Sequence, residues 1–231
     1  GSHPHFSPGQ NQGNQTRLCA HPPLEYPRRG DATNVVYQGM GGEVCCAYSG
    51  GEDSVVTFRE TALKGAFTID LDPVADERGF FARSWCVKEF EANGLETRLV
   101  QCNVSFNTLR GTLRGMHYQV APAAEVKVVR CTQGAIHDVI ADLRPESPTY
   151  KRTFSVILSA ENRRMLYIPP YFAHGFLTLT DDAEVFYQMS EYYVPACARG
   201  FRWDDATFAI AWPDQVRIIS AKDRDYPDFV G

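Results

Sequence analysis

Long apolar runs and positive charge are both scarce in this chain of 231 residues. No stretch approaches the roughly 20 apolar residues that a transmembrane helix needs, so a membrane is not an expected partner. There are only five lysines, no basic cluster is longer than two residues, and the formal net charge is −5. Because binding to a phosphate backbone depends on clustered positive charge, nucleic acid is not an expected partner either. The 44% of apolar residues is typical of a globular protein with a packed core.

Paired cysteine motifs are also missing. The seven cysteines form an odd set without C-x-x-C spacing, so neither a disulfide framework nor a zinc site is indicated. Cys131 ends an apolar run, which favours a buried free thiol. A reducing compartment, the cytoplasm, fits this cysteine usage best.

The first quarter of the chain differs in composition from the rest. All five lysines lie beyond residue 60, whereas nine of the 18 glycines come before it. The start Gly1-Ser2-His3 resembles the remnant of an expression tag, and residues 4–17 are rich in Pro, Gly, Gln and Asn. We therefore predict an N-terminal extension over residues 1–56, partly disordered, followed by a single domain over residues 57–231.

Short runs that alternate in polarity or are rich in β-branched residues dominate the chain from residue 67 onward. Only Val87–Asn93, closed by Gly94, has the pattern of a helix. Many strands with so little helix, and without a βαβ rhythm, predict an all-β sandwich or closed barrel. The predicted strands are Phe67–Leu71, Leu99–Phe106, Val126–Cys131, Ile136–Leu143, Phe154–Leu158, Met165–Ile168, Phe176–Leu179 and Val185–Met189.

Two of the six histidines are candidates for chemistry. His137 lies in an apolar strand, where a structural role with its hydrogen bonds satisfied is the expected one. His117 and His174 each open or line a strand, and they would share a site if both faced the interior of a barrel. Strand alternation points Arg114 and His117 to opposite faces unless Gly115 introduces a bulge. Spacing alone leaves this open.

Six segments occur in an order that is similar to one known family, the dTDP-4-dehydrorhamnose 3,5-epimerases. The chain resembles members of this family across about residues 57–227. The segments are Arg78-Gly79-Phe80-Phe81, Gln101-Cys102-Asn103, Leu113-Arg114-Gly115-Met116-His117-Tyr118-Gln119, Ile168-Pro169-Pro170-Tyr171-Phe172-Ala173-His174-Gly175-Phe176, Tyr192-Tyr193-Val194-Pro195 and Ser220-Ala221-Lys222-Asp223.

The resemblance implies a cupin-type jelly-roll barrel with a few short helices. It also implies a homodimer that exchanges N-terminal strands and acts, without metal or other cofactor, on a nucleotide-linked 4-keto-6-deoxyhexose in deoxysugar biosynthesis. Carried over by position, His117 resembles the catalytic base and Asp223 the carboxylate that orients it. Tyr187 resembles the acid on the opposite face of the sugar, and Lys127 the lysine near the C4 oxygen.

Further positions resemble the substrate contacts of the family. Arg78 is similar to an arginine that reaches the nucleotide from the partner subunit. The implied substrate-binding residues are Arg78, Gln101, Asn103, Arg114, His174 and Lys222.

These residue types suit the reaction. The C4 ketone acidifies the protons at C3 and C5, so their removal needs a base, a stabiliser of the enolate oxygen and a donor across the ring. A neutral imidazole backed by a carboxylate is such a base, and Lys127 and His174 are candidate donors to the oxygen. Tyr187 is protonated at neutral pH and can return a proton. From the residues alone, Tyr187 would sooner be read as a packing residue of its strand.

Several alternatives remain. The same residues fit an epimerase of C3 only or C5 only on another nucleotide sugar, and a 3,4-ketoisomerase or a non-catalytic sugar-nucleotide binding module is also considered. A metal-dependent cupin oxygenase is disfavoured, because Gln119 breaks the HxH pair that would hold a metal and Arg114 would repel it. Arg83 and Ala198 stand where well-known members often carry acids at the nucleotide end, which leaves the nucleotide open.

Overall fold

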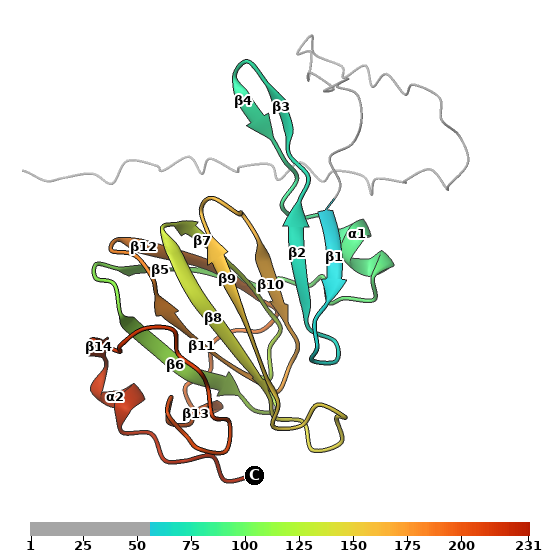
Figure 1. Ribbon diagram of the computed structural model, residues 1–231. Coiled ribbons are helices and arrows are strands. Elements are labelled where there is room, and N and C mark those ends of the chain that lie inside the picture. Colours follow the sequence, from blue (N-terminus) through green and yellow to red (C-terminus); the bar gives the residue numbers. More distant parts are fainter. Residues whose placement is uncertain (1–55) are drawn as a thin grey trace, which may run out of the picture. The chain divides into compact units, whose positions relative to one another are not determined.

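The computed structural model describes residues 56–231, and the predicted N-terminal extension lies outside these residues except for Val56. Two large sheets face each other (Figure 1). The first sheet has the order β1 (Val56–Glu60), β2 (Phe67–Leu71), β10 (Met165–Ile168), β7 (Lys127–Gln133), β12 (Ala183–Met189) and β5 (Gln101–Asn107). The second sheet has the order β13 (Ala198–Gly200), β6 (Thr112–Gln119), β11 (Phe172–Thr178), β8 (Ala135–Asp142) and β9 (Thr153–Ser159).

The remaining elements are short. A hairpin of β3 (Val74–Asp76) and β4 (Gly79–Phe81) extends beyond β2, and β14 (Ile218–Ile219) runs parallel to β6 (Figure 1). The helices are α1 (Val87–Ala92) and α2 (Ala221–Arg224). Among the described residues, no helix is long and apolar enough to cross a membrane.

The all-β prediction is confirmed, and all eight predicted strands are present within a few residues of their expected bounds. The helix α1 also lies where it was expected, and Gly94 ends it with a φ of +69°. The sequence patterns did not predict β1, β6 or the shortest elements. Strand β6 contains a glycine at its centre, and β3, β4, β13 and β14 have only two or three residues, too few for a period to emerge.

The main core fills the space between the two sheets. It combines Val129 and Val185 of the first sheet with Ile140, Leu158 and other side chains of the second, all at most 5% exposed. Burying each such side chain contributes about 1.5–3 kcal/mol. Cys131 belongs to this core, and burial raises the pKa of its thiol to about 11, which confirms the expected buried free cysteine.

The C-terminal segment, residues 201–229, packs on the outer face of the second sheet. Phe201, Phe208 and Phe229 of this segment pack with Val139 of β8 and Met116 of β6. Strand β8 is therefore buried on both faces, which fits the apolar stretch Val139–Ala141 in its second half. The same coverage carries α2 to the side of β6.

Asp142, at the end of β8, holds the turn that follows through buried hydrogen bonds. Its fully buried carboxylate accepts from the side chains of Arg144, Ser147 and Thr149. Burial by itself raises the pKa of Asp142, but these hydrogen bonds outweigh it and lower the pKa to about 2.

We expect Asp142→Asn to cost stability in a pH-dependent way. The lowering of the pKa from 3.8 to about 2 corresponds to about 2–3 kcal/mol, which is present above pH 4 and is lost as the pH falls toward 2. Denaturant unfolding of both proteins from pH 7 to pH 2 measures this. The difference in free energy of unfolding should narrow below pH 4, and a difference that stays constant would contradict the assignment.

Candidate active site

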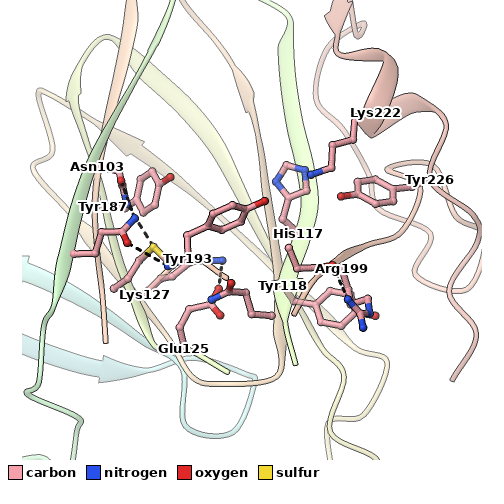
Figure 2. A pocket seen from close by; sticks show the side chains of 14 residues that line it. Asn103, His117, Tyr118, Glu125, Lys127, Tyr187, Tyr193, Arg199, Lys222 and Tyr226 are labelled. Carbon is pink, nitrogen blue, oxygen red and sulfur yellow. Dashed lines mark hydrogen bonds and ion pairs between the residues drawn. The ribbon is translucent and has the colours of Figure 1, made fainter. Parts of the chain in front are cut away.

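Two cavities meet between the sheets. The first has a volume of about 370 Å³ and the second about 390 Å³, and both are lined by His117, Lys127 and Tyr187. Figure 2 shows His117 on one side of the first cavity, with Asn103, Tyr187 and Lys127 on the other. His117 comes from the second sheet, whereas Lys127 and Tyr187 come from the first. The three side chains thus face a common space from both layers of the fold.

His117 is joined to the C-terminal helix. Its Nε2 lies 2.7 Å from Oδ1 of Asp223, while the other carboxylate oxygen accepts the backbone N–H of Gly115. Ser220 caps α2 by accepting the N–H of Asp223, which fixes the carboxylate in the first turn. Burial by itself raises the pKa of Asp223, but the hydrogen bonds from His117 and Gly115 hold it below its ordinary value.

This pairing sets the chemistry of the imidazole. Since the ionised carboxylate of Asp223 can only accept, Nε2 of His117 carries the proton that it shares with Asp223. The lone pair of the neutral ring is then on Nδ1. The His117 side chain is 40% exposed, so this ring can reach a molecule in the cavities. His117 can therefore act as a base toward a bound ligand.

A bulge in β6 places Arg114 and His117 on the same face. His117 pairs with His174, and Arg114 with Phe176, so three steps along β6 match two along β11. Gly115 supplies the bulge with a φ of +122°, and a Cβ there would lie 2.6 Å from the Cα of Gly175. Arg114, His117 and His174 consequently all line the second cavity, which spacing alone had left open.

His174 has its own carboxylate. Its Nε2 lies 2.9 Å from Oδ2 of Asp138 on β8, and Asp138 is fully buried. The second oxygen, Oδ1, has no hydrogen-bond partner among residues 56–231. Asp138 was not predicted as a site residue, because only the pairing of β8 with β11 brings it behind His174.

Lys127 is paired in the same way. Its Nζ lies 2.7 Å from Oε1 of Glu125, and their side chains are only 12% and 3% exposed. Glu125 was also missed in the sequence, although it lies only two residues before Lys127.

Tyr187 lies on β12 beside Asn103 of β5 and Val129 of β7. Burial raises the pKa of its phenol above the ordinary value. The charge of Arg114 acts in the opposite direction, and that of Glu125 adds to the rise. The phenol therefore keeps its proton at neutral pH. Tyr187 packs against the main core, as the reading from the residues alone expected, and it also lines both cavities.

Three further sequence-predicted residues line the first cavity. Gln101 donates to Asn103 within β5, and its amide oxygen accepts the backbone N–H of Tyr193. Lys222 of α2 lies against Tyr226, and their hydrogen bond raises the pKa of the lysine. These residues form the polar rim of the first cavity.

Arg78 lies elsewhere. It belongs to the turn between β3 and β4, pairs with Asp76, and lines neither cavity of this chain. Arg83, one of the two departures from the family pattern, pairs with Glu89 of α1 at 2.9 Å. The other departure, Ala198, does line the first cavity.

Gln119 stands where metal-binding cupins have a second histidine. Its amide donates to the carbonyl oxygens of Ala123 and Tyr192 and accepts from the N–H of Val194, so it ties two loops together. Over the described range, residues 56–231, no three His, Cys, Asp or Glu side chains gather in an arrangement that could hold a metal ion.

His137 lines neither cavity, in agreement with a structural role. The expectation that its hydrogen bonds are satisfied is wrong in one respect, because Nε2 is buried without a partner in the described part of the chain. Its ring lies 6.2 Å from that of Trp212, edge to face, and burial lowers the pKa of the imidazole.

Tyr118, Tyr193, Arg199 and Tyr226 complete the wall of the first cavity and were not predicted. Tyr193 lies in one of the segments that carried the resemblance, which could have indicated it. Tyr226 follows Asp223 by three residues, and Arg199 follows Tyr193 by six, but only the fold brings both segments to the cavity that His117 lines.

Comparisons with known proteins identify a family. The family model of dTDP-4-dehydrorhamnose 3,5-epimerase matches residues 60–230. A protein of this name from Shigella flexneri is 46% identical over 172 residues, which covers 74% of this chain and 94% of that protein.

Solved structures extend the likeness to the fold. The Bacillus anthracis enzyme of the same name, with TDP and PPi bound, matches with a TM-score of 0.73 and 42% identity, covering 76% of this chain and 100% of that one. A 3,5-epimerase from Legionella pneumophila in complex with dTDP-4-keto-L-rhamnose matches with a TM-score of 0.68 and 37% identity, covering 73% and 90%. The jelly-roll prediction is thereby confirmed, and the chain belongs to the dTDP-4-dehydrorhamnose 3,5-epimerase family.

Proposed function

We propose that this protein is an isomerase that epimerises C3 and C5 of a nucleoside-diphosphate-4-keto-6-deoxyhexose, of the dTDP-4-dehydrorhamnose class, in deoxysugar biosynthesis. The observation that carries this proposal is the arrangement of the His117–Asp223 pair opposite Tyr187, with Lys127 lining both cavities beside them. The names of the relatives, and the nucleotide and sugar nucleotide described with two of them, support the same substrate class.

The reaction begins with proton removal. Nδ1 of His117 takes the proton from C3 or C5, and the electron pair of the broken C–H bond moves toward the C4 carbonyl to form an enolate. The imidazolium that results is stabilised by Asp223, which is ionised because its pKa lies below its ordinary value. A general base of this kind contributes about 10²–10⁴-fold to the rate.

The enolate oxygen needs donors. The ammonium of Lys127 can donate to it, and His174 in its protonated form can donate from Nδ1 while Nε2 is held by Asp138. Each well-placed donor of this type is typically worth about 3–4 kcal/mol in the transition state. Arg114, which is anchored by a 2.7 Å hydrogen bond to Asn107, adds positive charge to the same cavity.

Reprotonation completes the inversion. The phenol of Tyr187 gives its proton to the carbon from the face opposite His117, and the C4 carbonyl re-forms. The phenolate regains a proton and His117 releases one, so no proton is gained or lost over the cycle. We assign the diphosphate to the rim with Lys222 and Arg199, where the cavity wall is most basic.

The decisive experiment follows hydrogen exchange. In D₂O, the wild-type protein with dTDP-4-keto-6-deoxyglucose should incorporate deuterium at C3 and C5, as read by NMR. His117→Asn should reduce this exchange by about 10²–10⁴-fold, because the base is lost. Label at one carbon alone would indicate a mono-epimerase, and no exchange with any nucleotide form would falsify the proposal. A protein that binds the substrate equally well with and without His117 and never exchanges would be a binding module.

Tyr187→Phe separates removal of the proton from its return. His117 still exchanges the proton with solvent in this variant, so deuterium should enter while the configuration at the labelled carbon is retained. Inversion should fall far more than exchange. Comparing deuterium content with the stereochemistry of recovered sugar checks this, and equal loss of both would argue against Tyr187 as the acid.

We also propose a homodimer in which the β3–β4 hairpin carries Arg78 to the site of the partner. Arg78 lines neither cavity of its own chain, and the hairpin exposes Val74, Phe80 and Phe81, which are 47–58% exposed. Apolar groups gathered on a projecting hairpin are typical of an interaction surface. A cytoplasmic location is proposed as well, since the four cysteines of residues 56–231 are free thiols.

The hairpin can be tested by Phe80→Ser combined with Phe81→Ser. Removing both rings should shift the protein from dimer to monomer in sedimentation velocity and raise KM for the nucleotide sugar. Arg78→Ala is the matched control, which should stay dimeric and still raise KM. A double serine variant that stays dimeric with an unchanged KM would rule out this role of the hairpin.

A further inference from the structure

The burial of the Glu125 carboxylate is difficult to explain by a contribution to the stability of the fold. Its side chain is 3% exposed and lines the first cavity. One oxygen, Oε1, lies 2.7 Å from Nζ of Lys127. The other, Oε2, is buried and has no hydrogen-bond partner within residues 56–231. Leaving such an oxygen unpaired costs about 1–3 kcal/mol, and more when the group is charged.

The backbone next to Glu125 is held by hydrogen bonds that do not involve Lys127. The intervening Val126 is buried, donates its N–H to Oγ of Ser190 and accepts the N–H of Ser190 at its carbonyl. Glu125 lies two residues before Lys127, and both side chains line the first cavity. The ammonium of Lys127 lies at the end of a long flexible stem, whereas the carboxylate of Glu125 has a shorter stem and is attached next to a residue whose backbone is hydrogen-bonded on both sides. The carboxylate therefore determines where the ammonium lies.

The pair repeats a pattern of the site. The imidazole of His117 has Asp223 behind it, and that of His174 has Asp138. Asp138 also has a buried oxygen without a partner in the described chain. A buried ion pair is in general no more stable than well-packed neutral groups, so stability gives no reason for these carboxylates. Their shared feature is that each one holds a group that lines the cavities.

We propose that Glu125 is a positioning residue of the epimerase reaction, which holds the ammonium of Lys127 in the orientation that donates to the enolate oxygen. This inference rests on the proposed function. An ammonium aimed in advance needs no reorientation as negative charge develops, and a misplacement of about 1 Å can cost 10²-fold in rate. Glu125 itself acts through Lys127 and does not touch the reacting carbons.

A second effect of the same charge supports the proposal. Tyr187 has its pKa raised first by burial and further by Glu125, against the opposing charge of Arg114. The carboxylate thus also favours the protonated phenol that the reaction uses. Both consequences are felt during turnover rather than in folding.

Glu125→Gln keeps the shape of the side chain and removes the charge. We expect kcat for deuterium exchange to fall by about 10- to 100-fold with KM nearly unchanged, because the loss is in the transition state. The midpoint of thermal unfolding should stay the same or rise. Asp70→Asn is the control, since Asp70 also pairs with a basic side chain, that of Arg164 at 2.7 Å, but lines neither cavity. The control should leave kcat unchanged.

A double-mutant cycle tests whether Glu125 acts through Lys127. Lys127→Met should itself lower kcat strongly, and adding Glu125→Gln to it should have little further effect at neutral pH, because burial alone keeps the phenol of Tyr187 protonated there. Glu125→Asp is a second probe. It keeps the charge but moves the carboxylate away from Lys127, because the side chain is one methylene shorter, and it should also lower kcat. Wild-type kcat in both Glu125 variants, or additive losses in the cycle, would overturn the inference.

The two proposals fail in different ways. Absence of exchange by the wild-type protein with every nucleotide form would remove the proposed function and the inference with it. Exchange by the wild type together with unaltered exchange by the Glu125 variants would remove only the inference. A normal thermal midpoint in Glu125→Gln alongside a reduced kcat would support a role in positioning over a role in folding.

Discussion

The hydrogen bond between His117 and Asp223 is the contact on which the site depends most. It joins β6, in the middle of the second sheet, to a four-residue helix that the chain reaches only more than 100 residues later. The helix arrives there because Phe201, Phe208 and Phe229 pack on the outer face of that sheet. Burial of aromatic side chains on one face thereby positions a carboxylate that orients an imidazole toward the other face.

Two further buried carboxylates repeat this arrangement around the cavities. Asp223, Asp138 and Glu125 are all nearly inaccessible, and each contacts one polar group that faces the ligand space. Such carboxylates lose hydration and gain only one or two hydrogen bonds, so they stabilise the fold little. They restrict the directions in which His117, His174 and Lys127 can donate or accept protons. The barrel tolerates the cost because its larger core, between the two sheets, is apolar throughout.

Much of the fold follows from local pattern. Alternating and β-branched runs indicated eight strands, and the helix α1 was marked by its closing glycine. Strand β6 was not predicted, because Gly115 interrupts the alternation of polar and apolar residues. The same interruption places Arg114 on the same face as His117. Glu125 and Asp138 were not predicted as site residues, for a different reason. Carboxylates two residues from a lysine or inside a strand are common in sequences, and only burial shows that these two are unusual.

The sequence by itself determined the all-β class, the absence of a long apolar span and, through six ordered segments, the family resemblance with its main polar residues. These properties depend on composition, on period and on short motifs, which are local. The tertiary structure decided which side chains share a cavity, which carboxylate stands behind which base, and that Arg78 lies outside the site of its own chain. Those relations depend on strand register and on packing between distant segments, and neither is encoded in any single stretch of the chain.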